Sequence, residues 1–527
     1  MKDASSRPRR KVLKIFLYIA GSLLFLLIAG FFITPGIIRK KLDEALRGLP
    51  SSIKVSYRAV HANVLTGSLD IEGVEAKYVP EGKDGRYADS GAHSVSIGKI
   101  EVGGFSFFTW LRSHRVRVRD IRLIGVSVHA DEDILEKDSS LQTLKGPDVD
   151  MLVGKVEVTE LTIETTRKGK RSLSLGGRLR LDSVTRDAVA GVWFLADSAR
   201  YVAVDADETI RLRRLEVDSR KQLLTIDTLR AVPDMDREAI GREKGHQVDV
   251  ARAELRGVEV TGLDVMGLAR HRLYADEISL KSNSVHVFRD RRLPLVPGEK
   301  EMPMEGLKSM PVELRVKRVK FGPTRFEYEE FPKVGNKSGA LVIEHFHGSM
   351  EPLVNKPRPS DPAFITLTTE GSLMGSGTVT ATTRMPLHKG ADYAVEGVFH
   401  NLDVTKLNNP AENLGQLHLE SGMLNSLEFQ FEMGEERSTG KIVGEYHDLV
   451  VDKMKEKDGQ LKTDKFKSFA LKKFIIPKDK DKSLPVSKRT GKVDYKRDKE
   501  RYFSYYMLHS LLVGVKSSFS LGFLLPG

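Results

Sequence analysis

The sequence predicts a mainly β protein: an elongated antiparallel sheet of repeated strands that follows one N-terminal transmembrane helix and precedes a short C-terminal helix. Three observations lead to this prediction. One uncharged, strongly apolar run occupies residues 15–33. From residue 50 onward, apolar and polar residues alternate with a period of two, which is typical of half-buried strands. A second apolar segment, residues 502–527, ends the chain.

The run at residues 15–33 is long enough to span a membrane, because about 20 apolar residues cross a bilayer core. Residues 1–14 carry the larger basic cluster, which predicts a cytoplasmic N-terminal tail and a body outside the cytoplasm. A cleaved signal peptide is the alternative, but its apolar region would be shorter and would end in a small-x-small cleavage site. We therefore expect an uncleaved single-pass anchor.

Residues 34–49 predict a short amphipathic helix at the membrane surface. Thr34 can cap this helix and Pro35 suits its first position. Apolar residues then recur at helical spacing until Gly48 and Pro50 end the pattern.

Strand patterning fills the body, in a first part over residues 50–292 and a second part over residues 293–451. Residues 116–123 alternate apolar side chains with arginines, with one slip at Asp120 that predicts a β-bulge. Residues 156–163 repeat this pattern, slip included. One apolar and one charged face is typical of a half-buried antiparallel strand. The proline-containing stretch 293–311 predicts a long connection over the sheet edge.

A loose internal repeat supports an elongated sheet. Residues 116–131 and 273–290 both contain an Ile-x-Leu strand, a turn, a Val-His pair and then an acidic residue. Residues 154–165 and 317–330 are shorter variants. Repeated hairpins stack into a long sheet whose ends need caps. Two β-sandwiches in tandem are the alternative, which the sequence leaves open.

The C-terminal part combines charge with apolar character. Residues 452–501 hold 18 Lys/Arg against 9 Asp/Glu, which accounts for most of the formal net charge of +12. This Lys-rich segment is either a solvated tail or a contact for anionic lipid headgroups. Residues 502–527 predict a helix that caps the sheet and also touches a membrane or a partner. The candidate contact residues are Tyr502, Phe503, Tyr506, Leu511 and Leu512.

Composition and motifs exclude several kinds of site. The absence of cysteine rules out disulfides, thiolate zinc sites and iron–sulfur clusters. The chain has no GxxxxGK[ST], GxSxG or HExxH motif. The nearly balanced charge of the body argues against nucleic acid as a partner. His345 and His347 are interpreted as a surface pair on one strand. We expect no catalytic residue, no metal site and no cofactor, and hence no enzyme.

Two stretches resemble the AsmA-like family of envelope proteins of two-membrane bacteria. Residues 61–74 read HANVLTGSLDIEGV after the anchor. The segment 391–452 contains the other matching features, Gly422-Met423-Leu424 and Tyr446-His447-Asp448-Leu449, ahead of the basic tail. The resemblance implies an anchor in the inner (cytoplasmic) membrane and a body in the periplasm.

The resemblance also implies a curved sheet, open along one side as a groove, whose apolar concave face binds or transfers lipid and supports outer-membrane lipid homeostasis. Membrane lipids, phospholipid above all, and a second envelope protein would be the partners. The lipid-facing candidates on that face are Val118, Leu123, Val158, Ile163, Val319 and Phe321.

Two other functions stay open at this point. An envelope scaffold with a closed β core could bind a protein partner through the C-terminal tail. A membrane-tethered hydrolase is a third possibility, although no recognisable site supports it. The first two differ in whether the apolar strand face holds a ligand or packs on itself.

Overall fold

A computed structural model describes residues 53–63, 66–78, 93–105, 116–133, 151–185, 188–203, 207–457, 460–463 and 487–518. The predicted N-terminal tail, transmembrane helix and juxtamembrane helix, residues 1–49, lie outside these ranges. Strands account for 67% of the structure, so the prediction of a mainly β fold is confirmed. Among the described residues, no helix is both long enough and apolar enough to cross a membrane.

The chain divides into two compact units. Unit 1 comprises residues 1–229 and 262–270, and unit 2 comprises residues 230–261 and 271–527. The division therefore falls well before the proline-containing stretch at 293–311 that separates the two parts expected from the sequence.

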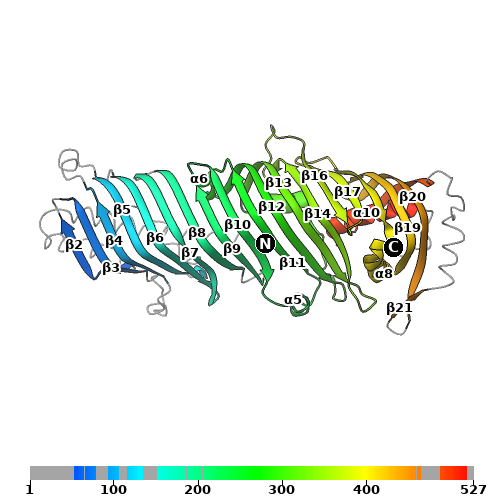
Figure 1. Cartoon of the computed structure of the whole chain (residues 1–527), viewed down its shortest axis with the longest axis horizontal. Helices are drawn as coiled ribbons and strands as arrows, with labels where there is room; N and C mark the ends of the chain where they lie inside the picture. The colour runs from blue at the N-terminus through cyan, green and yellow to red at the C-terminus, as the bar shows by residue number, and fades with distance from the viewer. Residues whose placement is uncertain are drawn as a thin grey trace. The chain divides into compact units, whose positions relative to one another are not determined.

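Unit 1 is built from strands that pair mostly with their neighbours in sequence (Figure 1). Strands β1 and β2 both pair with β3. The elements are β1 (Ile53–Ser56), β2 (Ala59–Asn63), β3 (Ser68–Tyr78), β4 (Ser94–Gly103), β5 (Val116–Asp131), β6 (Met151–Arg167), β7 (Lys170–Thr185), β8 (Val189–Ala203), β9 (Glu208–Asp218), β10 (Leu223–Pro233, which ends inside unit 2) and the short helix α6 (Val265–Leu268).

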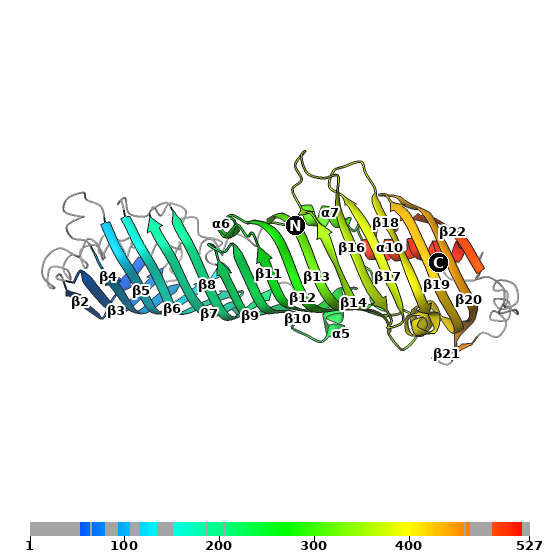
Figure 2. The same ribbon diagram turned by 45° about the horizontal axis from the view of Figure 1, so that its top comes forward.

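Unit 2 contains the later strands and the longest described helix, α10 (Figure 2). Its strands are β11 (Asp249–Thr261), β12 (Arg272–Asp290), β13 (Glu313–Phe331), β14 (Gly339–Glu351), β15 (Leu353–Val354), β16 (Phe364–Leu373), β17 (Gly377–Pro386), β18 (Tyr393–Asp403), β19 (Leu417–Met433), β20 (Arg437–Lys457), β21 (Gln460–Thr463) and β22 (Ser487–Lys496). Its helices are α5 (Arg237–Lys244), α7 (Pro303–Lys308), η2 (Val404–Leu407), α8 (Asn408–Gly415) and α10 (Phe503–Ser518).

The expectation of a purely antiparallel sheet is wrong, because two described strand pairs are parallel. Strand β5 pairs with β6, and β12 pairs with β13, in parallel register. These four strands are the two copies of the internal repeat seen in the sequence. The register agrees as well: His129 lies opposite Glu164 in unit 1, and His286 lies opposite Glu327 in unit 2. The repeat is therefore a parallel strand pair rather than a hairpin.

A parallel pair needs a crossover connection, and in unit 2 residues 291–312 provide it. Inside this segment the buried side chains of Met302 and Met304 join an apolar cluster that includes Ile365 and Val395. The Met304 amide donates a hydrogen bond to the Tyr393 hydroxyl at 3.0 Å. The stretch predicted to run over a sheet edge therefore packs against apolar side chains of β16 and β18.

The predicted bulges are partly confirmed. In β6, Glu160 has a left-handed backbone (φ 53°) and the pairing with β7 shifts between Val158 and Leu161. At Asp120 the pairing of β5 with β4 ends, opposite Gly103, while the pairing of β5 with β6 passes this residue without a register shift, so no bulge is seen there. The Lys-rich segment 452–501 also differs from a free tail, because β22 lies within it and pairs with β20.

Candidate functional site

In unit 1 the apolar side chains of β3, β4 and β5 are buried in one cluster and do not form an open face. Three of the predicted lipid-facing side chains lie in one buried cluster there, with Val118 3%, Leu123 8% and Val158 2% exposed. Ile163 is half-buried and packs against the same cluster. Side chains this inaccessible behave as an ordinary core, so these four residues lie in or against a core rather than on an open surface.

The two remaining candidates, Val319 and Phe321, lie in unit 2 and are half-buried. Each belongs to a row of residues that lie directly opposite one another on successive strands. The Phe321 row runs from β12 to β22 through Leu280, Phe321, Gly348, Thr369, Ala381, Gly397, Phe429, Ile442 and Gly491. The Val319 row runs beside it through Ile278, Val319, Met350, Leu367, Thr383, Val395, Phe431, Gly440 and Val493.

Neither row contains a charged residue, although each crosses nine strands. The row between them points to the opposite face, because successive side chains in a strand alternate. That row reads Ser279, Lys320, Ser349, Thr368, Thr382, Glu396, Gln430, Lys441 and Lys492. The sheet of unit 2 therefore has one apolar and one polar face, as the alternation in the sequence predicts.

Glycines in the Phe321 row make space for aromatic rings. A Cβ added at Gly348 would lie 3.0 Å from the ring tip of Phe321, and one added at Gly397 would lie 2.5 Å from that of Phe429. The two rings therefore cover the neighbouring glycine backbones, a recurrent way of stabilising glycine within a sheet. Phe346 adds a third ring, 5.4 Å from Phe321 between centroids.

Helix α10 covers the β20–β22 end of this face (Figure 2). A stripe of small residues lets it approach closely: a Cβ added at Gly491 of β22 would lie 2.0 Å from the carbonyl oxygen of Gly514. Ser510 and Ser438 of β20 have hydroxyl oxygens 2.7 Å apart. Tyr506 is fully buried, and burial raises its pKa to about 12. Its hydroxyl donates to the carbonyl of Gly434 at 3.2 Å.

The predicted membrane or partner contacts on this segment divide into two groups. Tyr502 is 45% and Leu512 39% exposed, so both are accessible. Tyr506 is 0% exposed, which contradicts its assignment as a contact residue. Phe503 and Leu511 pack against the buried cluster of unit 2. Leu508 is 47% exposed, but the sequence did not identify it as a contact residue. Residues 502–515 are apolar on every side of the helix, so the pattern does not show which side is exposed.

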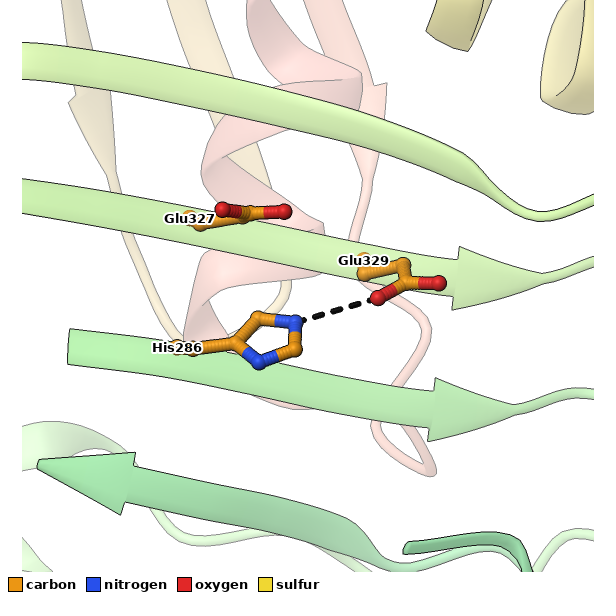
Figure 3. A group of neighbouring side chains, drawn as sticks. All are labelled: His286, Glu327 and Glu329. Atoms are coloured by element: carbon orange, nitrogen blue, oxygen red, sulfur yellow. Dashed lines mark hydrogen bonds and ion pairs between the residues drawn. The ribbon is translucent and has the colours of Figure 1, made fainter.

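A polar cluster on the other face of β12 and β13 was missed from the sequence (Figure 3). His286, Glu327 and Glu329 place potential metal-ligand atoms within 4.8 Å of one another. The Nε2 atom of His286 lies 3.1 Å from Glu329. The repeated Val-His pair was the sequence feature that lay closest to this cluster, but it did not indicate that an acidic side chain would lie beside the histidine.

This cluster is better explained as an ion network than as a metal centre. Arg237 of α5 donates to both carboxylate oxygens of Glu329, and the Ser338 hydroxyl donates to one of them at 2.6 Å. Burial alone would raise the pKa of Glu329, but these hydrogen bonds lower it. A metal would have to displace the guanidinium. The network instead holds α5 against the polar face, where Arg237 also lies 4.4 Å over the Phe288 ring.

Comparison with known proteins adds no relative: no family model, no curated protein and no solved structure matches the chain.

Proposed function

We propose that this chain is a membrane-anchored lipid-binding or lipid-transfer protein whose acyl-chain site is the apolar face formed by the Phe321 and Val319 rows. The observation that carries the proposal is the pair of uncharged rows across nine strands, half-buried at Val319 and Phe321 and covered by a helix at one end. The rows are fully buried at Val395, Phe431 and Ile442 but only half-buried from β12 to β17, and a partly exposed apolar face there calls for an occupant. Each methylene removed from water there contributes about 0.8 kcal/mol.

The location belongs to the same proposal. The apolar run at 15–33 and the basic cluster before it support an anchor in the inner membrane, with the N-terminus in the cytoplasm and the body in the periplasm. The AsmA-like resemblance supports a role in outer-membrane lipid homeostasis, without enzymatic activity. A reporter fused after Gly527 tests the topology: activity is expected outside the cytoplasm, and a cytoplasmic readout would refute it.

The lipid proposal is tested by purifying the full chain in mild detergent and analysing bound lipid by mass spectrometry. Phospholipid is expected at near-stoichiometric amounts. The Phe321→Glu variant places a carboxylate among the apolar side chains of the Phe321 row. An unpaired charge next to acyl chains is strongly unfavourable. Because Phe321 is half-buried, this variant is expected to stay folded and lose lipid. The matched control is Lys320→Glu, the neighbouring exposed residue on the polar face.

The alternative is an envelope scaffold with a closed β core that binds a protein through its C-terminal segment. The closed cluster around Val118 in unit 1 and the exposed Leu508 and Leu512 of α10 favour this alternative. Protein free of lipid would support it. So would a Phe321→Glu variant that fails to fold while Lys320→Glu folds normally, because that result places Phe321 in a closed core.

A further inference from the structure

The apolar face of unit 2 ends in charged side chains at the end of β12 and β13. Along β12 the alternation runs Val285, Val287, Arg289, and their register partners on β13 are Phe326, Tyr328 and Glu330. Alternate residues in a strand share a face, but the pairing of β13 with β14 is irregular between Phe321 and Phe326, so the alternation slips there and the apolar side chains of β13 beyond it are the even-numbered ones. The apolar face therefore ends at two charged residues, Arg289 and Glu330. Arg289 lies beside the start of α10, with its guanidinium 5.2 Å from the Tyr502 ring.

Not every arginine here is available to a ligand. Arg289 is buried and forms a two-pronged pair with Asp249, with its Nε 2.6 Å from the carboxylate. Guanidinium and carboxylate geometry match in such a pair, which leaves little donor capacity. Arg289 therefore has a structural role in holding β12 to β11.

Arg291 and Arg501 differ from Arg289, because each keeps an unpartnered donor. Arg291 donates from Nη1 to Glu330 at 2.8 Å, and its Nε has no hydrogen-bond partner. Arg501 has its Nε 3.6 Å from the Asp498 carboxylate, beyond hydrogen-bond distance, and without another partner. A buried donor without an acceptor is unfavourable. Both side chains nevertheless remain partly exposed, 30% for Arg291 and 15% for Arg501, so an additional anion can approach their guanidinium groups.

Aromatic rings lie beside Arg501, and both arginines lie close enough to His509 to act on its charge. The Arg501 guanidinium lies 5.2 Å from the Tyr505 ring, and that ring lies 3.9 Å from His509. Burial, together with the positive charges of Lys516, Arg291 and Arg501, lowers the pKa of His509 to about 4, against which Glu330 acts. The imidazole is therefore neutral at pH 7, and the cluster around it has an excess of positive charge.

We infer that Arg291 and Arg501, beside the start of α10, form a site for a phosphate-type anion at the end of the apolar face. This inference rests on the proposed function, because a lipid whose acyl chains lie on the Phe321 and Val319 rows would place its headgroup at such an end. Guanidinium groups suit phosphate oxygens through directed, charge-assisted hydrogen bonds. The same chemistry fits a lipid headgroup or free phosphate, and the preferred ligand is an anionic phospholipid.

The test uses the full chain, immobilised in detergent and equilibrated with mixed micelles of phosphatidylglycerol and diacylglycerol of matched chains. Mass spectrometry of the retained lipid gives the enrichment of phosphatidylglycerol. Wild type is expected to enrich it by about tenfold or more, as a charge-assisted hydrogen bond allows. The Arg291→Gln/Arg501→Gln variant is expected to retain both lipids without preference. Arg325→Gln, on the polar face of β13, is the matched control and should behave as wild type.

Each outcome distinguishes the two proposals. Equal retention of both lipids by wild type, or an enrichment that the double variant keeps, overturns the headgroup site and leaves the acyl-chain site intact. Retention of neither lipid overturns the proposed function itself. Enrichment that inorganic phosphate abolishes identifies free phosphate as the ligand and overturns the assignment to lipid. Should the double variant fail to fold because Glu330 loses its pairing with Arg291 and keeps only the Tyr328 hydroxyl, Arg501→Gln alone provides the same reading.

Discussion

The contact between α10 and β22 can be tested with a single methyl group. In the Gly491→Ala variant the added Cβ would lie 2.0 Å from the carbonyl oxygen of Gly514, whereas Cβ atoms essentially never approach closer than 3.0 Å. The atom in the way belongs to the backbone of the helix, so no side-chain rotation relieves the clash. The helix has to move away from the sheet by about 1 Å, and overpacking of this kind costs about 1–3 kcal/mol.

Hydrogen exchange measures this cost directly, because amides of α10 exchange when the helix detaches locally from the sheet. A loss of about 1–3 kcal/mol predicts exchange that is about 5-fold to about 150-fold faster across residues 503–518, since about 1.4 kcal/mol corresponds to a factor of ten. Amides of β5 in unit 1 should be unaffected.

The matched control is Gly176→Ala in β7, where the nearest atom to the added Cβ is 3.9 Å away. Both variants replace a strand glycine by alanine, so intrinsic strand preference largely cancels between them. Equal exchange of α10 in wild type and Gly491→Ala would refute the reasoning, because the helix could then not rest on Gly491.

Three further predictions follow from burial and charge. Val118→Glu places a charge in the closed core of unit 1, so its thermal unfolding transition should shift down sharply or vanish; an unchanged melting temperature would contradict that closure. Burial lowers the pKa of His509 to about 4, so as the pH falls below 6.5 this histidine is protonated in the unfolded chain before it is protonated in the folded one. The free energy of unfolding should therefore decrease between pH 6.5 and pH 4, by about 2 kcal/mol at pH 5. His509→Gln should remove that difference between urea titrations at pH 7 and pH 5, and an unaltered difference would rule out this histidine as its source. Glu329→Gln weakens the pairing with Arg237 and should cost about 1.5–3 kcal/mol in the same titration, with faster exchange of α5 amides; wild-type stability would show that the network contributes nothing.

The sequence by itself determined the strand class and the polarity of its faces. Alternation with period two is a local property, because each side chain in a strand points opposite to its neighbours. For this reason Val319 and Lys320 could be assigned to different faces before any pairing was known. The repeat of Val-His and Ile-x-Leu likewise marked the two strand pairs that prove equivalent in the structure.

Only the tertiary structure decided how the strands pair and what covers each face. The sequence of β12 does not reveal that its partner β13 runs parallel, since that depends on the crossover of residues 291–312. Local pattern also could not tell that Val118 lies in a closed core while Phe321 stays half-buried, because exposure depends on segments distant in the chain. Tyr506 and Leu508 are both large side chains two residues apart on one helix, yet the sheet buries the first and leaves the second 47% exposed. Which side of an apolar helix meets its sheet is set by close packing, here by Gly491 and Gly514 in contact. Ser510, Gly514 and Ser518 recur at four-residue spacing on that side, but this spacing acquires its meaning only when the partner strand with its own glycine is known.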